Sequence, residues 1–212
     1  MPKIYIATSN PGKLRELQEA ARSLDVDLQS LPGFDVLPVA IEDGDTFEAN
    51  ARIKAGHYSR LVPGLLVLAE DSGLSVDELN GAPGVYSARY AATLTNDSSS
   101  SSLHSNSNDQ DNNRTLIAQL ERRPESRHAG KYVCVIALAR DGQTLATFSG
   151  EAHGELRTQP RGTGGFGYDP LFYFPSLGKT FAELSLAEKR RHSHRGQAFR
   201  QFLDWYTKGQ HP

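Results

Sequence analysis

The chain has 212 residues, of which 38% are hydrophobic and 23% are charged. This length suffices for one sizeable hydrophobic core, and we expect a single domain of at most two lobes. The 23 basic and 25 acidic residues leave a formal net charge of -2. A broad positive surface for nucleic acid or an anionic membrane is therefore excluded, and any anion site must be local.

Cysteine content and apolar runs narrow the cellular context. The single cysteine, Cys134, excludes an internal disulfide and a multi-cysteine metal site, and it is typical of a reducing compartment, so we expect the cytoplasm. The longest apolar runs, 65–69 and 133–139, are far shorter than the about 20 residues of a membrane span, and the amino terminus lacks a signal-peptide core. We expect no membrane partner.

The residue pattern in the amino-terminal third of the sequence predicts a strand, two helices and a second strand, in that order. Residues 3–7 are a β-rich run, and the apolar residues after 8–12 recur at helical spacing. A second helix, capped by Asp45 or Thr46, should run to about Leu61. The apolar run 65–69 predicts a buried strand that stops at Glu70 and Asp71, with both carboxylates at its end.

The rest of the chain predicts helices around a hairpin. Residues 96–113 are almost wholly Ser, Asn and Asp, so we expect a mobile surface loop within the domain. A helix should follow at Thr115–Arg122, and Asp141-Gly142 between two apolar runs predicts an antiparallel hairpin. Ser185 and Glu188 form a capping box that should open one terminal helix. We therefore predict an α/β fold around a mixed sheet, with a cleft where the loops gather.

The first candidate site lies between the first strand and the first helix. Hydroxyl, amide, lysine and helix N–H groups can converge there on one phosphate. The stretch lacks the glycine and the hydroxyl residue of a Walker A loop, and an ordinary capped helix start explains it equally well. Its residues are Thr8, Ser9, Asn10, Pro11, Gly12 and Lys13.

Two pairs of carboxylates form a second candidate site. Glu42 and Asp43 precede the second helix, whereas Glu70 and Asp71 follow the apolar strand. Such oxygen ligands suit Mg²⁺ or Mn²⁺. Solvation alone explains Glu42 and Asp43 well. Glu70 and Asp71 are like charges side by side at the edge of a core, where they need a cation, and this favours a functional role for that pair.

A glycine-rich loop is a third candidate. Residues 162–167 match the pattern G-x-G-x-x-G, but Tyr168, Asp169 and Pro170 follow, so no helix can begin there and a dinucleotide fold is rejected. Four glycines around Phe166 instead predict an irregular loop whose aromatic face can stack on a base. A turn that buries Phe166 in the core is the alternative.

A basic segment, Lys189–Arg195, holds four fixed cations and two histidines. It suits a triphosphate or nucleic-acid phosphate. On one continuous helix, only side chains three or four positions apart point together, so at most about half of them could touch one ligand. A solvated helix face is the alternative.

Taken together, these segments resemble the bacterial form of the inosine triphosphate pyrophosphatase family, from Lys3 to about Phe202. Each motif alone is weak, but this many in one order is specific. The motifs are Thr8–Lys13 with Glu16, Thr46–Ala51 with Lys54 and Ala55, Ala69–Leu74 with Val76 and Asp77, Gly81–Gly84 with Ser87–Tyr90, Gly162–Phe172, Lys179 and Thr180 with Ala182–Leu184, and Lys189 with Ser193–Arg195.

The resemblance implies a two-lobed α/β protein with an elongated mixed sheet flanked by helices, an active-site cleft and a homodimeric state. It implies Mg²⁺-dependent hydrolysis of ITP, dITP and XTP to the monophosphate and pyrophosphate. By this likeness Asp71 is the general base and a metal ligand, Glu42 is a second ligand, and Ser72 contacts the nucleotide. Thr8–Lys13 and Lys189 would hold phosphate, and His194 and Arg195 would face the purine. Base and ribose would be enclosed by Phe166, Gly167, Tyr168 and Asp169. Glu70 would be an extra partner of the metal or of water, and Lys54 is a weaker candidate.

Two departures from the family pattern stand out. Many members carry Asp where this chain has Glu70, and the Ser-rich stretch is longer than usual. Two other functions compete with hydrolysis of ITP, dITP and XTP. One is a pyrophosphatase of the same fold with a drifted substrate, and the other is a nucleic-acid-binding module that uses Lys189–Arg195, against which the net charge argues.

Overall fold

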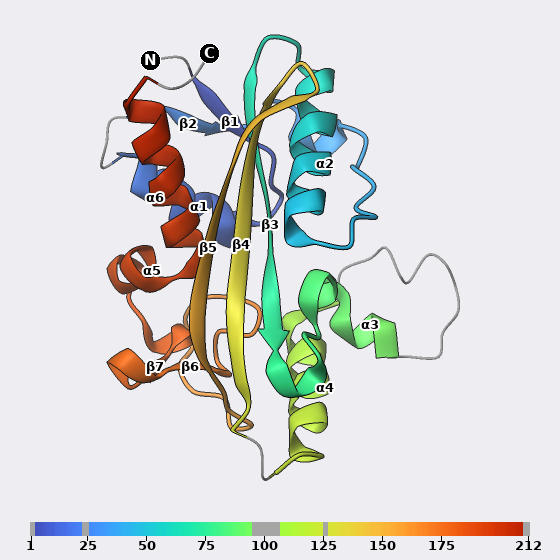
Figure 1. The fold of residues 1–212 in the computed structure, drawn as a ribbon, viewed down its shortest axis with the longest axis vertical. Helices are drawn as coiled ribbons and strands as arrows, with labels where there is room; N and C mark the ends of the chain where they lie inside the picture. The colour runs from blue at the N-terminus through green and yellow to red at the C-terminus, as the bar shows by residue number, and fades with distance from the viewer. Residues whose placement is uncertain (1–2, 23–25, 95–106, 125–126, 210–212) are drawn as a thin grey trace. The chain divides into compact units, whose positions relative to one another are not determined.

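The computed structural model describes residues 3–22, 26–94, 107–124 and 127–209, which form a seven-stranded sheet with helices around it (Figure 1). The strand order is β2-β1-β3-β4-β5-β6-β7. Strand β1 pairs in parallel with β2 and β3, whereas β5–β6 and β6–β7 are antiparallel. The sheet is therefore mixed, as predicted. The strands are β1 (Ile4–Ile6), β2 (Leu28–Ser30), β3 (Leu66–Val76), β4 (Ala129–Arg140), β5 (Gln143–Leu156), β6 (Phe172–Phe174) and β7 (Lys179–Thr180).

The helices follow from local capping and apolar spacing. Thr46 caps the second helix by accepting from the Ala49 N–H, and Asn108 caps α4 by accepting from the Asp111 N–H. No helix among the described residues is long and apolar enough to cross a membrane. The α-helices are α1 (Pro11–Arg22), α2 (Phe47–Leu61), α3 (Tyr90–Leu94), α4 (Asp109–Glu121), α5 (Leu186–His192) and α6 (His194–Thr207).

The chain divides into two compact units, and each is assembled from separate segments. The first unit comprises 1–72, 133–151 and 190–212, and the second comprises 73–132 and 152–189. Each unit has its own apolar core. The expectation of an active-site cleft between two lobes stays a prediction.

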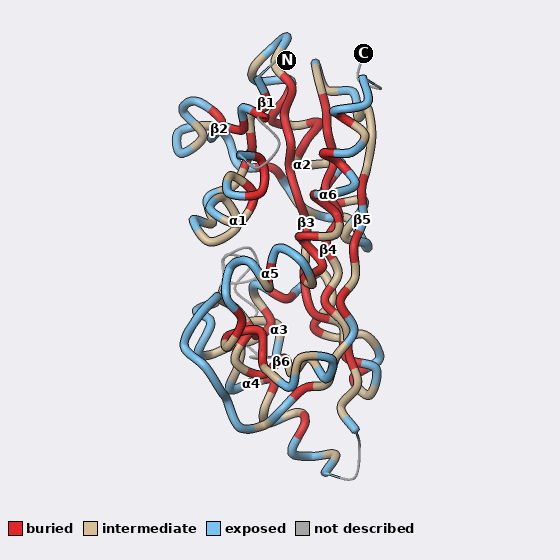
Figure 2. Tube along the Cα trace, turned by 90° about the vertical axis from the view of Figure 1, so that its left-hand side faces the viewer, coloured by how far each residue is buried: buried red, intermediate tan, exposed pale blue. Residues whose placement is uncertain are grey.

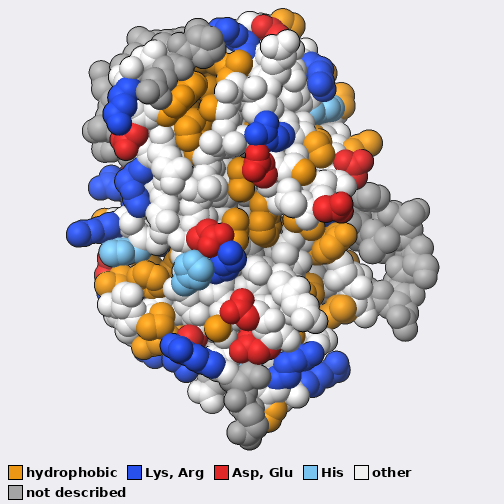
Figure 3. Space-filling model, viewed as in Figure 1, with side chains coloured by type: hydrophobic (Ala, Val, Ile, Leu, Met, Phe, Trp, Pro, Cys, Tyr) orange, Lys and Arg blue, Asp and Glu red, His pale blue; other side chains and the backbone are white. Residues whose placement is uncertain are grey.

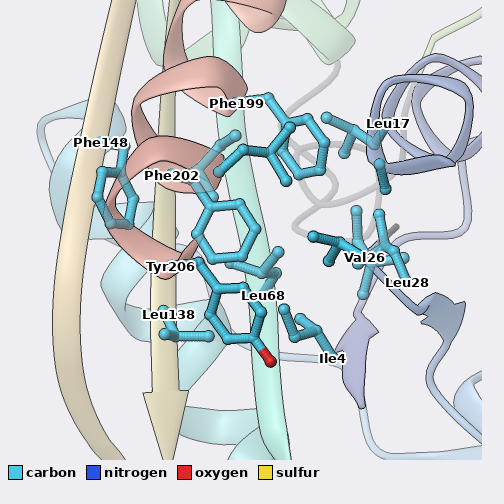
Figure 4. Close-up of a cluster of buried hydrophobic side chains, with 14 of the residues drawn as sticks. Ile4, Leu17, Val26, Leu28, Leu68, Leu138, Phe148, Phe199, Phe202 and Tyr206 are labelled. Atoms are coloured by element: carbon cyan, nitrogen blue, oxygen red, sulfur yellow. The ribbon is translucent and has the colours of Figure 1, made fainter. Parts of the chain in front are cut away.

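Alternation along β3 sorts the core of the first unit into two layers. Leu66 and Leu68 join the cluster of α1 and α6, where Phe199, Phe202 and Tyr206 contribute aromatic rings (Figure 4). Val67 and Ala69 join a second cluster with α2. Figure 1 shows α1 and α6 on one side of these strands and α2 on the other, and Figure 2 shows β3 and β4 buried through most of their length. In this part of β3, which lies in the first unit, even-numbered residues thus face α1 and α6, and odd-numbered ones face α2.

Several predicted elements are confirmed. Strand β1, the end of α2 at Leu61 and the capping box of Ser185 and Glu188 all lie where the sequence placed them. The turn at Asp141 and Gly142 joins two neighbouring strands, and both residues have the positive φ of a type I′ turn. Strands joined by two residues are antiparallel, so the predicted hairpin is present.

Three predictions of element limits were wrong. Strand β3 does not stop at Glu70 but continues to Val76, because protein cations neutralise its carboxylates. Helix α4 begins at Asp109 rather than Thr115, because Asn108 caps it, so residues 109–113 of the expected 96–113 loop are helical, while 95–106 lie outside the described residues. The terminal helix is two helices, since Ser193 interrupts it and caps α6 by accepting from the Gly196 N–H.

Replacing Phe202 with alanine should lower the free energy of unfolding by about 3–5 kcal/mol, because its ring is fully buried against Phe148, Phe199 and Tyr206. Urea unfolding measures this loss. The control is Leu186→Ala on the exposed side of α5, which should stay within about 0.5 kcal/mol of wild type. Equal losses in both variants would contradict the packing.

Candidate functional site

Two adjacent carboxylates on β3 point to opposite faces of the sheet. Glu70 continues the even-numbered face that packs on α1 and α6, and Asp71 continues the face that packs on α2. Glu70 is 4% exposed and Asp71 is 9% exposed. From the sequence, the two carboxylates were expected to lie side by side and to need a cation. The strand instead separates them, so each has its own cationic partner.

Arg195 and Lys13 neutralise Glu70. The Arg195 guanidinium donates from Nε to Glu70 Oε2 at 2.8 Å and from an Nη to Oε1 at 3.1 Å, and Lys13 Nζ lies 2.9 Å from Oε1. Burial alone would raise the pKa of Glu70, but the Arg195 and Lys13 charges outweigh it and hold that pKa well below its usual range. Glu70 is therefore a buried, ionised anchor for two cations.

The same guanidinium reaches two more side chains. The Nη that bonds Glu70 also donates to the Ser72 hydroxyl at 3.1 Å, and the other Nη donates to Glu16 at 2.9 Å. Glu16 received no role from the sequence, although its position three residues after Lys13 on α1 places both side chains on one helix face, which is a usable signal. Arg195 thus links α6 to α1 and to β3.

On the opposite face, Lys54 of α2 bridges two carboxylates. Its Nζ lies 2.9 Å from Asp71 Oδ1 and 2.8 Å from Glu42 Oε2. Burial lowers the pKa of Lys54, but Asp71 and Glu42 raise it by more. Burial raises the pKa of Asp71, and the charge of Lys54 only partly offsets this. The predicted ligand pair Glu42 and Asp71 is brought together, with Lys54 between them.

The donor set around Asp71 fits a hard divalent cation. Asp71 Oδ2 is buried and has no hydrogen-bond partner among the described residues. Within those residues, no group of three or more His, Cys, Asp or Glu side chains is placed to hold a metal. One or two carboxylates with substrate phosphates and water are the usual ligands of Mg²⁺, which does not require a cage made only of protein. Glu42 and Asp71 match that pattern.

The stretch Thr8–Lys13 is a capped helix start. Asn10 Oδ1 accepts from the backbone N–H groups of Gly12 and Lys13, at 2.9 and 3.1 Å. These two donors are therefore used within the chain, contrary to the expectation that they point freely at an anion. Thr8 Oγ1 accepts from the Asn10 N–H, and Ser9 is exposed. The side chain of Lys13 extends to Glu70, so cationic and hydroxyl groups remain the phosphate candidates here.

In the second unit, a buried ion pair fastens the glycine-rich loop. Asp169 Oδ2 accepts from Lys189 Nζ and, at 2.9 Å, from the Phe166 N–H. Asp169 is 4% exposed and Lys189 is 5% exposed. The Lys189 ammonium also lies 5.3 Å from the centre of the half-buried Phe166 ring. The structure thus brings Phe166, Asp169 and Lys189 together.

The loop is irregular, as predicted, and its other contacts anchor it. Tyr168 is buried in the core of the second unit and donates its hydroxyl to the Ser87 carbonyl at 2.8 Å, so its ring is not offered to a ligand. Gly165 has φ +74, and a Cβ there would lie 2.0 Å from Asp169 Oδ2. Glycine at this position is required by both the backbone and the ion pair.

The segment Lys189–Arg195 is only partly solvated, because Arg190 and Arg191 are exposed whereas its other two fixed cations are buried. Lys189, His194 and Arg195 are all buried, and Ser193 separates the helix of Lys189 from that of the other two. The expectation of one continuous helix is corrected by this break. Arg195, expected to face a purine, directs its guanidinium to Glu16, Glu70 and Ser72.

Comparison with known proteins gives one consistent result. The Ham1 family matches residues 4–205. A dITP/XTP pyrophosphatase of Acidobacterium capsulatum is 48% identical over 200 residues, which are 94% of this chain and 96% of the relative. One from Yersinia pseudotuberculosis is 45% identical over 208 residues, 96% of this chain and 98% of the relative.

Solved structures agree with the fold. A HAM1 protein from Coxiella burnetii has a TM-score of 0.82 and 39% identity, over 98% of this chain and 100% of that chain. A nucleoside-triphosphatase, dITP/XTP pyrophosphatase, from Mycobacterium abscessus has a TM-score of 0.69 and 36% identity, over 95% and 98%. The mixed sheet and the helices around it make this an α/β protein with the fold of these solved structures. The chain belongs to the Ham1 family, which confirms the resemblance carried by the motifs.

Replacing Glu70 with glutamine should lower the free energy of unfolding by about 3–5 kcal/mol, because Arg195 and Lys13 would lose a buried anionic partner. The matched control is Glu48→Gln, which removes an exposed ion pair with Arg52 and should cost less than about 1 kcal/mol. Urea unfolding of both variants measures these changes. Equal losses of unfolding free energy would contradict the role of Glu70 as a buried partner of Arg195 and Lys13.

The gap between wild type and Glu70→Gln should also depend on pH. The folded pKa of Glu70 is depressed, so its contribution is complete above the unfolded pKa of about 4.3 and is lost as pH falls through the folded value. The difference in unfolding free energy should therefore shrink below about pH 4. A difference that widens with acid would have the wrong sign.

Proposed function

We propose that this protein hydrolyses ITP, dITP and XTP to the nucleoside monophosphate and pyrophosphate, and so removes deaminated purines from the nucleotide pool. Full-length relatives that are 41–48% identical carry the name dITP/XTP pyrophosphatase. The structural observation that carries the proposal is the Glu42–Lys54–Asp71 cluster, in which Asp71 Oδ2 is buried and lacks a hydrogen-bond partner among the described residues.

The proposed cofactor is Mg²⁺, with Mn²⁺ as a substitute. Glu42 and Asp71 would hold it, and when bound it would neutralise phosphate charge and make a coordinated water more acidic. Lys54 holds both carboxylates close to each other through its two short ion pairs. The raised pKa of Asp71, caused by burial, also makes this carboxylate a stronger proton acceptor than an exposed aspartate.

The proposed reaction is attack of water at the phosphoanhydride between the α- and β-phosphates. Asp71 orients the water and accepts its proton, and the water oxygen forms the new bond to the α-phosphorus. The bond between the α-phosphorus and the bridging oxygen breaks, and that oxygen leaves with the pyrophosphate. Negative charge grows on the departing pyrophosphate, and Lys13 is the cationic side chain that follows the phosphate-binding stretch. Fixed positive charge at that position lowers the barrier. Thr8, Ser9, Asn10 and Ser72 would add polar contacts, with Lys189 as a further cation.

Selection among purines is proposed to act at position six of the base. A 6-oxo group accepts hydrogen bonds, whereas the 6-amino group of ATP would meet a donor with another donor. The proposed donors are His194 and Arg195, which are both buried at the start of α6; the Arg195 guanidinium also bonds to Glu70, Glu16 and Ser72. An unpaired buried donor costs about 1–3 kcal/mol, which corresponds to selection of about tenfold to a hundredfold.

In the second unit, the Phe166 ring is proposed to stack on a base, with Gly167 and Asp169 shaping the loop around it. Three observations support this. The ring is half-buried rather than enclosed, the backbone N–H of Phe166 is fixed by Asp169, and the Lys189 ammonium lies over the ring. An aromatic face held in this way suits any flat base and therefore contributes affinity more than selectivity.

Two other functions remain alternatives. A pyrophosphatase with a drifted substrate would share every contact described above, and a nucleotide panel separates it from the proposal. A nucleic-acid module that uses Lys189–Arg195 is disfavoured, because Lys189 and Arg195 are buried and paired with carboxylates. On the face that Figure 3 shows, acidic and basic side chains are interspersed rather than gathered into one basic area.

The proposed location is the cytoplasm, where the nucleotide pool lies. The proposed assembly is a homodimer formed through residues 36–41 of the first unit. Val36, Val39 and Ile41 are 80%, 81% and 73% exposed, and three exposed apolar side chains in one short segment support an interaction surface there. Val39 and Ile41 line a cavity with Arg52 and Arg60, and exposed Asp35 and Asp43 lie near in sequence. A surface with both signs of charge can pair with a copy of itself about a two-fold axis.

Replacing Asp71 with asparagine should reduce pyrophosphate release from dITP by at least about 100-fold, because asparagine cannot accept the proton. Release is followed with dITP, XTP, ATP and GTP in Mg²⁺, with and without EDTA. The matched control is Asp45→Asn, an exposed change before α2, which should retain wild-type rates. Turnover of ATP equal to that of dITP would overturn the specificity, and activity that survives EDTA would overturn the metal.

Replacing Val39 and Ile41 together with aspartate should convert the protein to a monomer, because two charges would enter an apolar contact. Sedimentation equilibrium at micromolar concentration measures the mass. Leu186→Asp, at an apolar side chain that is 41% exposed on α5, is the control and should remain dimeric. A wild-type monomer, or a dimeric double variant, would contradict the proposed interface.

A further inference from the structure

Both backbone groups of Gly167 are bonded to one helix. Its N–H donates to Asp109 Oδ2 at 2.7 Å, and its carbonyl accepts from Asn113 Nδ2 at 3.1 Å. Asp109 and Asn113 are four residues apart, so they share one face of α4. The two peptide groups that flank the Cα of Gly167 are therefore both held by α4.

The first turn of α4 is itself firmly placed. Asn112, which is 3% exposed, accepts from the Ala91 N–H at 2.9 Å and donates to the Ala88 carbonyl. Leu116 and Leu120 are fully buried on the same helix. A side chain fixed to such a helix can transmit its position to a loop, whereas one on a fraying end cannot.

Gly167 is the point where the loop needs this support. Its φ of +62 is a left-handed conformation that glycine adopts freely. Because glycine adopts other conformations just as freely, contacts from outside must fix this one. Asp169 fixes the Phe166 N–H, and Ser87 fixes the Tyr168 hydroxyl. Gly167 lies between these two fixed residues, so the conformation of its backbone determines the direction of the Phe166 ring, and both of its backbone groups bond to α4.

We propose that Asp109 and Asn113 are positioning residues that lock the Gly167 backbone and so present the Phe166 ring to the purine base. This inference rests on the proposed function, because it assigns the ring to a nucleotide. It also gives a role to the end of the Ser- and Asn-rich stretch, which the sequence analysis left without one. Neither residue touches the reacting atoms.

Steady-state kinetics with dITP test the proposal. Asp109→Ala and Asn113→Ala should each raise KM about three- to tenfold and change kcat less than about twofold, as expected when one hydrogen bond that orders a binding loop is lost. KM for dATP should rise by the same factor, because stacking does not read position six. Asp109→Asn keeps an acceptor oxygen and should remain within about twofold of wild type.

The matched control is Asp111→Ala. This residue is an acid in the same turn, but its carboxylate pairs with Arg114 and Asn108 rather than with the loop. It should leave KM within about twofold of wild type. An unchanged KM in Asp109→Ala, or an Asp109→Asn variant as impaired as Asp109→Ala, would overturn the positioning role.

Hydrogen exchange without nucleotide separates this inference from the proposed function. In wild type the Gly167 amide should be protected, and the peptide 163–171 should exchange faster in Asp109→Ala but not in Asp111→Ala. Equal exchange in all three proteins would overturn the clamp even if dITP is a substrate. Faster exchange in a protein that does not hydrolyse dITP would preserve the clamp but overturn its assignment to nucleotide binding.

Discussion

The period-two geometry of β3 is the constraint on which the site depends. Two consecutive acids on a buried strand cannot share a face, so Glu70 and Asp71 enter different layers of the first unit. A buried carboxylate needs a cation, and each layer supplies its own. Helices α1 and α6 bring Lys13 and Arg195 to one acid, and α2 brings Lys54 to the other. The adjacent acids therefore differ: both oxygens of Glu70 are paired with cations, whereas Asp71 Oδ2 has no hydrogen-bond partner in the part of the chain that the structure describes.

The second unit applies the same physical logic to a loop. A glycine-rich segment has little intrinsic order, so its shape must come from bonds to fixed elements. Asp169 receives Lys189 and the Phe166 N–H, Tyr168 reaches Ser87, and α4 holds Gly167. The loop is thus held by partners from three other segments of the chain and by its own Asp169. Its irregular path is compatible with a single orientation of the aromatic ring because these bonds act on successive residues.

Local signals in the sequence predicted most elements, and long-range charge pairing decided what they missed. Thr46, Ser185 and the Asp141-Gly142 turn act over a few residues, so the elements they control were predictable. The continuation of β3 through Glu70 depends on Arg195, which is 125 residues away, and no local pattern reveals that pairing. The motifs located Asp71, Glu42 and the Phe166 loop, whereas the contacts of Arg195 and the helical start at Asp109 required the fold.

The segmented construction of the first unit has a consequence for its synthesis. Its apolar core needs Ile4 and Leu17 from the beginning of the chain and Phe199, Phe202 and Tyr206 from the last helix. A ribosome that makes the protein in order must release residues up to 206 before those rings can pack. The second unit draws only on residues 73–189 and can close earlier. Until α6 leaves the exit tunnel, β1 and β3 carry exposed apolar faces, and chaperone contact should concentrate on this amino-terminal part.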